Sequence, residues 1–395
     1  MGSGGEGERR EDGLSATALA MRPEGTPPQD RLLGLEAIRF ASALSVLVWH
    51  YQHFFYVGVA PVDLVRADLP FHAALRLFYE HGYYGVQVFW CISGFIFSWK
   101  YGEAIAARTV PPRAFFILRL SRLYPLHLAT LLVVAALQPL YFARQGAFFV
   151  YQHNDLYDFV VQLFLASEWG FAPGESFNAP IWSISVEVLV YGLFFAILRY
   201  GSRSPLVNVG VLLLCLAARR LGLHHPFVDC LAFFYAGGLS AIAFGAVRDT
   251  PCRRPLALLA GAAVVAIPLL LPDRIGQHRN LFLLAWVPAL LFVAAQPARL
   301  SRRAQRIVEA AGNMTYSSYL LQFPIQLAIT TLLLPGTGSA ALFYSPVSFV
   351  AYIALTLVAA RLAYRLFELP AQVAIRRRLA GTRGGPAVTS SSVRE

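Results

Sequence analysis

Two ionisable side chains, Arg39 and His50, lie within the apolar run 33–56. A charged side chain at the centre of a bilayer costs about 2.5–3.5 kcal/mol on insertion scales, so such residues indicate function by default. Eleven helical steps bring both side chains to one face, about 16 Å apart along the helix axis. That separation is similar to the reach of a pantetheine arm. The arginine would hold a phosphate while the imidazole acts on the group that the arm carries.

A structural interpretation of the same run is equally open. Arg39 could extend to the membrane surface or pair with a helix neighbour, and His50 could be an interfacial histidine beside Trp49 and Tyr51. His53 lies on the same general face, three residues further on. Spacing alone does not decide between these interpretations.

Arg119 and Arg122 are three residues apart at the start of the apolar run 123–142. On a helix they face the same way, and paired guanidinium groups suit an anionic ligand. The alternative is that they contact lipid phosphate, as basic residues beside a membrane span commonly do.

A polar stripe follows Pro180, which we expect to start a helix. Ser183, Glu187 and Tyr191 recur every four residues in the run 181–198 and therefore share one face. Glu187 lies about two turns inside the span, where a carboxylate is costly unless a cavity meets it. The stripe predicts a functional carboxylate, with Ser183 and Tyr191 as candidate substrate-site residues.

Other patterns are less decisive. Ser93 and Gly94 form a small step that predicts close helix packing, and Ser93 is a further substrate-site candidate. The polar segment 316–324 is interpreted as a helix-contact surface. A helix is expected to end near Pro370, with Arg376, Arg377 and Arg378 against anionic lipid. The four cysteines show no metal-ligand spacing, so no metal site is expected.

Composition excludes an ordinary soluble enzyme. Of the 395 residues, 57% are hydrophobic and 14% are charged, and the mean hydropathy is +0.54. We expect an all-α polytopic membrane protein, since a bilayer needs roughly 20 apolar residues per helix. About ten such runs are present: 33–56, 82–99, 123–142, 181–198, 205–218, 228–247, 255–272, 280–296, 313–334 and 344–367.

Positive charge predicts the orientation of these spans. With both termini cytoplasmic, 23 of the 33 lysine and arginine residues fall on the cytoplasmic side and seven on the other. If the short apolar run 156–167 were a span, every later loop would move to the opposite side of the membrane, and most of the positive charge would then lie outside. We therefore exclude this run from the count. The net charge of +11 thus indicates membrane lipid as a partner rather than nucleic acid.

The predicted organisation is a transmembrane domain over 31–370 between two disordered cytoplasmic tails, 1–30 and the basic segment 371–395. Residues 1–30 contain no apolar run typical of a cleavable signal peptide.

Taken in order, these segments resemble the acyltransferase type 3 family of integral membrane O-acyltransferases. The resemblance covers residues 31 to 370. It depends on six motifs: Arg39 with His50, the segment from Gly85 to Phe95, Arg119 and Arg122 before Tyr124-Pro125, Trp182-Ser183 with Glu187, Ser318 to Leu321, and Glu368 with Pro370.

The resemblance implies transfer of an acyl group, usually acetyl, from cytoplasmic acyl-CoA to a hydroxyl of a carbohydrate, such as an exopolysaccharide, lipopolysaccharide or lipid-linked glycan unit. It implies a location in a bacterial inner membrane. His50 matches the catalytic histidine, Arg39 its motif partner, and Glu187 a supporting carboxylate. Arg119 and Arg122 match residues that bind the CoA phosphates. Many relatives have histidine at the position of Gln322, which cannot titrate.

Two different functions remain open from the sequence. A transporter of a lipid-linked sugar or a small anion would also line its site with buried charges. An acyltransferase acting on a macrolide or another acceptor would carry the same motifs.

Overall fold

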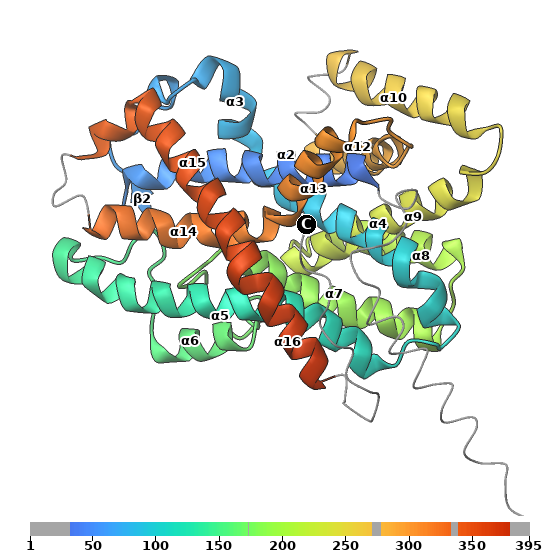
Figure 1. Cartoon of the computed structure of the whole chain (residues 1–395), viewed down its shortest axis with the longest axis horizontal. Helices are drawn as coiled ribbons and strands as arrows, with labels where there is room; N and C mark the ends of the chain where they lie inside the picture. Colours follow the sequence, from blue (N-terminus) through green and yellow to red (C-terminus); the bar gives the residue numbers. More distant parts are fainter. Residues whose placement is uncertain (1–31, 173, 271–277, 333–338, 380–395) are drawn as a thin grey trace, which may run out of the picture.

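The computed structural model describes residues 32–172, 174–270, 278–332 and 339–379. The predicted tail 1–30 lies outside these residues. Within them the chain is almost entirely helical (Figure 1). The helices of the first half are α2 (Leu33–His50), α3 (His72–His81), α4 (Gly85–Ala106), α5 (Pro112–Gln145), α6 (Leu156–Leu163), α7 (Ile181–Tyr200) and α8 (Pro205–Arg220). Those of the second half are α9 (Pro226–Val247), α10 (Arg253–Leu270), α12 (Arg279–Ala294), α13 (Arg302–Asn313), α14 (Thr315–Leu332), α15 (Pro346–Ala363) and α16 (Leu369–Leu379).

Short elements connect these helices. A 3-10 helix, η2 (Tyr51–Phe55), continues α2 and leads into the antiparallel strands β1 (Tyr56–Val57) and β2 (Ala60–Pro61). Three further 3-10 helices are η3 (Arg66–Asp68), η4 (Gly82–Tyr84) and η5 (Ser339–Tyr344). A π turn, η6 (Tyr364–Glu368), joins α15 to α16.

Each predicted span falls on a helix, but the count of ten is not confirmed. Among the described residues, six helical segments are long and apolar enough to cross a membrane: Leu33–Phe55, Pro112–Gln145, Ile181–Tyr200, Pro226–Val247, Arg253–Leu270 and Pro346–Leu379. The other four predicted spans correspond to α4, α8, α12 and α14. Helices α8 and α12 have only 16 residues each, while α4 and α14 carry more polar side chains. The excluded run 156–167 contains the eight-residue α6, which is too short to cross a bilayer.

Two helices extend beyond their predicted boundaries. Helix α5 begins at Pro112, before the predicted span 123–142, so Arg119 and Arg122 lie inside a helix, as their predicted common face requires. The expected disordered tail from 371 begins instead as helix α16, which continues to Leu379. The π turn η6 ends at Glu368, two residues before Pro370, and this wider turn lets the helix pass a proline whose ring would otherwise clash with the preceding turn.

Helix α9 packs against α4, α7, α8 and α12. The crossing of α4 and α9 depends on glycine, because a Cβ at Gly94 would lie 1.8 Å from the Phe234 carbonyl oxygen and one at Gly237 would lie 1.9 Å from that of Cys91. The predicted close packing at Ser93-Gly94 is therefore confirmed.

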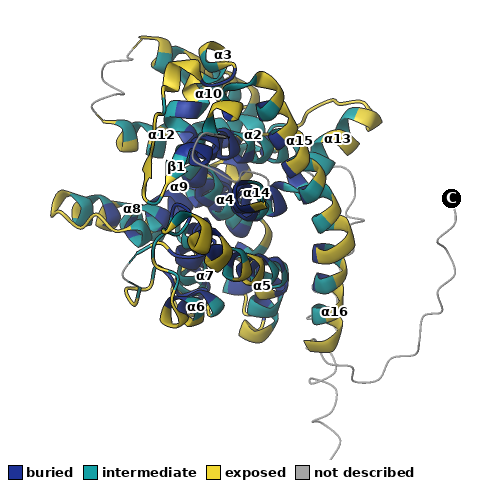
Figure 2. Ribbon diagram, turned by 90° about the vertical axis from the view of Figure 1, so that its left-hand side faces the viewer, coloured by how far each residue is buried: buried dark blue, intermediate teal, exposed yellow. Residues whose placement is uncertain are grey.

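Burial separates the core from the periphery. Buried residues gather around α2, α4 and α14, whereas α10 has no buried residue and α15 is mostly exposed or half-buried (Figure 2). Apolar side chains such as Leu214, Leu258 and Val347 are at least 70% exposed. A surface this apolar is suited to lipid, and the six apolar segments agree with a membrane protein.

Candidate active site

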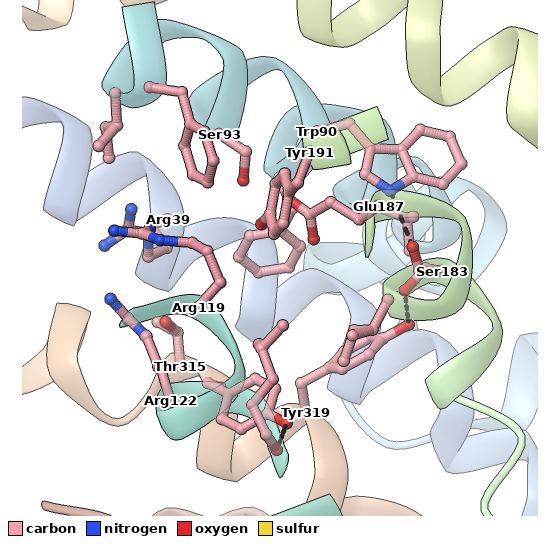
Figure 3. Close-up of a pocket in the computed structure, with 17 residues that line it drawn as sticks. Arg39, Trp90, Ser93, Arg119, Arg122, Ser183, Glu187, Tyr191, Thr315 and Tyr319 are labelled. Carbon is pink, nitrogen blue, oxygen red and sulfur yellow. Dashed lines mark hydrogen bonds between the residues drawn. The ribbon is translucent and has the colours of Figure 1, made fainter. Parts of the chain in front are cut away.

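A cavity of about 140 Å³ lies where α2, α4, α5, α7 and α14 meet (Figure 3). All of the predicted site residues except His50 line it: Arg39, Ser93, Arg119, Arg122, Ser183, Glu187 and Tyr191. They come from four helices that are far apart in the sequence. Figure 3 shows the three arginines on one side of the cavity and Ser183 and Glu187 on the other.

Two of the arginines are held in place by neighbouring side chains. Arg39 donates from one guanidinium nitrogen to both carboxylate oxygens of Glu36, at 3.0 and 2.8 Å. Arg119 donates to the Tyr101 hydroxyl at 2.6 Å and lies over the rings of Phe97 and Tyr101, 4.6 and 4.8 Å from their centroids. The Glu36 carboxylate compensates the charge of Arg39, as the helix-neighbour interpretation of Arg39 predicts, whereas Arg119 is held by uncharged groups that do not compensate its charge.

Arg122 shares the cavity with these two residues, and the carboxylates of Glu368 and Glu36 interact electrostatically with it. The three guanidinium groups outnumber the carboxylates of Glu36 and Glu368, so this side of the cavity carries a net positive charge. The basic side of the cavity is therefore suited to an anion.

The polar stripe of α7 faces the cavity, as its spacing predicts. Glu187 lies near the hydroxyls of Ser93 and Tyr191, and its Oε1 atom is buried without a hydrogen-bond partner among the described residues. The Ser183 hydroxyl lies 2.9 Å from the Tyr319 hydroxyl. A buried carboxylate oxygen without a partner is costly, so this side of the cavity is suited to a hydrogen-bond donor.

His50 lies outside the cavity lining, at the last residue of α2. Its Nδ1 atom is 2.8 Å from the Val46 carbonyl oxygen. A carbonyl can only accept, so Nδ1 carries the proton and Nε2 keeps its lone pair. The backbone of α2, rather than Glu187, thus fixes the tautomer of this ring.

A second histidine lies beside His50. The ring centroid of His53 is 4.9 Å from that of His50 and 6.1 Å from that of Tyr151. The Nδ1 atom of His53 is buried and has no hydrogen-bond partner in the described part of the chain. Gln326 of α14 completes the cluster by donating to the His50 carbonyl oxygen at 2.8 Å.

The segment 316–324 does more than pack between helices. Tyr316 and Tyr319 line the cavity, and Tyr151 lies close to both Tyr319 and the His53 ring. The sequence did show hydroxyl side chains at helical spacing in this segment. It could not show whether those side chains face the cavity or a neighbouring helix. Gln322 is 1% exposed, and neither of its amide atoms has a partner among the residues described.

Comparison with known proteins gives two curated relatives. Protein 2 in the picA locus of Rhizobium radiobacter is 29% identical over 109 residues, which are 28% of this chain and 47% of that protein. The acyltransferase MdmB of Streptomyces mycarofaciens is 28% identical over 169 residues, 42% of this chain and 38% of that protein. The chain thus spans less than half the length of either relative. No solved structure matches it.

The family comparison is far more extensive than these pairwise matches. An acyltransferase domain family matches residues 32–365, a range that includes every residue of the cavity lining and His50. We conclude that this chain belongs to the acyltransferase type 3 family, and its six apolar helical segments agree with a membrane protein.

Proposed function

We propose that this protein transfers an acyl group, acetyl in the simplest case, from acyl-CoA to a hydroxyl of a carbohydrate acceptor. The observation that carries the proposal is the convergence of Arg39, Arg119 and Arg122 on one cavity of an acyltransferase. Acyl-CoA is an acyl donor with phosphates at one end and a thioester at the other. Its phosphates fit the basic side of the cavity, and its reacting end points away from the arginines.

His50 is the proposed general base. Its Nε2 atom removes the proton from the acceptor hydroxyl while the hydroxyl oxygen attacks the thioester carbonyl. The carbon–sulfur bond then breaks, and the imidazolium returns the proton to the departing thiolate. The products are an acyl ester and free CoA. A route in which the imidazole first takes the acyl group gives the same products.

Glu187 has a separate place in this scheme, since the tautomer of His50 is set by Val46. Glu187 lines the cavity with Ser93 and Tyr191, and its Oε1 atom has no hydrogen-bond partner among the described residues. We propose that Glu187 accepts a hydrogen bond from the pantetheine arm or from the acceptor. Ser183 and Tyr191 would contact the same ligands.

The orientation belongs to the same proposal. Both termini face the cytoplasm of a bacterial cell, and the protein lies in the inner membrane. Acyl-CoA enters from the cytoplasmic side, where the arginines lie.

The scheme is tested by His50→Ala in purified protein, with release of CoA measured in the presence of a polysaccharide acceptor. Loss of the general base is expected to lower kcat by about 10²–10⁴-fold. His224→Ala is the matched control, because His224 is an exposed loop histidine and its loss should leave the rate unchanged. A folded His50→Ala protein with full transfer activity contradicts the scheme. Flux of a lipid-linked sugar without consumption of acyl-CoA would favour a transporter instead.

A further inference from the structure

Arg376, on the C-terminal helix α16, lies against the turn of α5 that carries Arg119 and Arg122. Its Nε atom donates to the Ser121 hydroxyl at 3.1 Å, and Ser121 is 1% exposed between the two arginines of α5. In Figure 1 the continuous helix from α15 to α16 crosses α14 and α5. Arg376 thus joins the basic side of the cavity from a distant part of the chain.

A chain of buried polar contacts holds Arg376 in this position. Its second bond runs from a terminal nitrogen to the Gln372 side-chain oxygen at 3.1 Å. Gln372 donates in turn to Glu368 at 3.2 Å, and Glu368 accepts from the Ser317 hydroxyl of α14 at 2.7 Å. Since Ser317, Glu368 and Gln372 are all at least 90% buried, this guanidinium group is placed by the core rather than by solvent.

The neighbouring arginines of α16 differ from Arg376. Arg377 and Arg378 are exposed, as a segment lying against anionic lipid would be. Arg376 is half-buried within electrostatic range of Arg119 and Arg122. Bringing a third like charge into this group is unfavourable, and an anion with several negative charges would offset the repulsion.

The size of the cavity supports a ligand that extends beyond it. At about 140 Å³ it is smaller than the roughly 300–1,000 Å³ of pockets that enclose a drug-sized ligand. A cavity of this size encloses only part of an acyl carrier such as acyl-CoA. Arg376 is not part of the cavity lining, but its partner Ser121 lies between two residues that are.

We propose that Arg376 extends the basic side of the cavity beyond its lining and, together with Arg119 and Arg122, forms a phosphate subsite for the nucleotide end of the acyl donor. This inference rests on the proposed use of acyl-CoA. It also assigns a function to α16, whose buried polar chain connects the subsite to α14. Arg376 acts as a binding residue and takes no part in proton transfer.

The test compares two donors, acetyl-CoA and S-acetyl-pantetheine, which lacks the nucleotide and its phosphates. Arg376→Ala is expected to raise KM for acetyl-CoA about tenfold or more, the loss typical of one charge-assisted hydrogen bond. Its kcat with acetyl-CoA and its kinetics with S-acetyl-pantetheine should stay unchanged. Arg376→Lys should recover part of the affinity, because it keeps the charge without the planar fork. Arg377→Ala is the matched control, one residue away and exposed.

Direct binding of adenosine 3′,5′-bisphosphate to purified protein separates this inference from the proposed function. Weaker binding by Arg376→Ala than by Arg377→Ala supports the subsite even if turnover with a chosen acceptor is absent. Equal binding by both variants overturns the inference but leaves acyl transfer intact. A wild-type protein that neither binds the bisphosphate nor consumes acetyl-CoA overturns both.

Two further results would overturn the subsite. An equal rise in KM for both donors would place the effect at the reacting end of the ligand. An effect that appears only in nanodiscs containing anionic phosphatidylglycerol, and is absent in phosphatidylcholine, would assign Arg376 to a lipid headgroup.

Discussion

His50 obtains its tautomer from its own helix. The Val46 carbonyl lies one turn earlier and fixes the proton on Nδ1, so no second side chain has to be brought to the ring for this purpose. This arrangement leaves Glu187 available to a ligand. The structure therefore differs from the sequence-based prediction mainly in which groups the site residues contact.

A single residue, Glu175, predicts how the folding stability of the protein depends on pH. This residue precedes α7 outside the apolar segments, and its carboxyl group lies near Tyr151 and Tyr319. Although Glu175 is exposed as a whole, partial desolvation of its carboxyl group by surrounding protein raises its pKa to about 7, and the negative charge of Glu168 adds to the effect. The folded protein therefore binds this proton more tightly than the unfolded chain, so folding stability falls as pH rises from about 4.5 to about 7.

Glu175→Gln should remove this dependence, because glutamine does not ionise. We expect the variant to have a higher Tm than wild type at pH 8 and the same Tm at pH 4, measured by thermal unfolding in one detergent. Asp249→Asn, at an exposed carboxylate, is the control. A Tm difference that is constant across this pH range would contradict the assignment.

Two adjacent residues of helix α4 have different roles. One allows the helix to pack closely against α9, and the other lines the cavity. Gly94 brings its backbone against α9, and Ser93, one residue earlier, turns toward the cavity. A shift of α4 away from α9 would thus move Ser93, Trp90 and Phe97 within the site. The position of these side chains in the cavity therefore depends on how α4 packs against α9.

Gly94→Ala tests this connection. The added methyl group has no room against the Phe234 backbone, and overpacking of this kind typically costs about 1–3 kcal/mol. We expect a lower Tm and a lower acyl-transfer rate. Gly102→Ala on the same helix meets no atom within 4 Å and should leave both unchanged or raise the Tm slightly. Equal Tm values for the two variants would show that α4 and α9 do not cross this closely.

At the scale of the whole molecule, the positions of the apolar helices match the hydropathy of the sequence, whereas the number that cross the bilayer remains a prediction. Helices α4 and α14 are not among the six segments that are long and apolar enough to cross a membrane, and both carry polar residues that line the cavity. Such helices can still cross a membrane when their polar side chains face the protein interior. An even number of spans places both termini on one side.

Cys252 provides a native probe of this orientation. It is exposed between α9 and α10 on the predicted cytoplasmic side, whereas the other three cysteines are buried. A membrane-impermeant maleimide should therefore label the wild-type protein only after the cells are permeabilised. His224→Cys, in the loop between α8 and α9, should add a site that is labelled in intact cells. Labelling of Cys252 in intact cells would reverse the proposed orientation.

The sequence by itself determined the features that depend on local order. Hydropathy located the helices, helical periodicity placed Ser183, Glu187 and Tyr191 on one face, and the order of the motifs indicated the family. It could not define the boundaries of α5 and α16, because prolines near helix ends are compatible with both a start and a continuation.

Only the tertiary structure decided which residues meet. Arg39 of α2 and Arg119 of α5 share a cavity, His50 lies apart from Glu187, and Arg376 is placed beside Ser121. These neighbours come from helices whose contacts depend on the packing of bulky and small side chains, such as the backbone approach at Gly94. Helical periodicity determines which side chains share one face of a helix. Which other helix packs against that face depends on the rest of the chain.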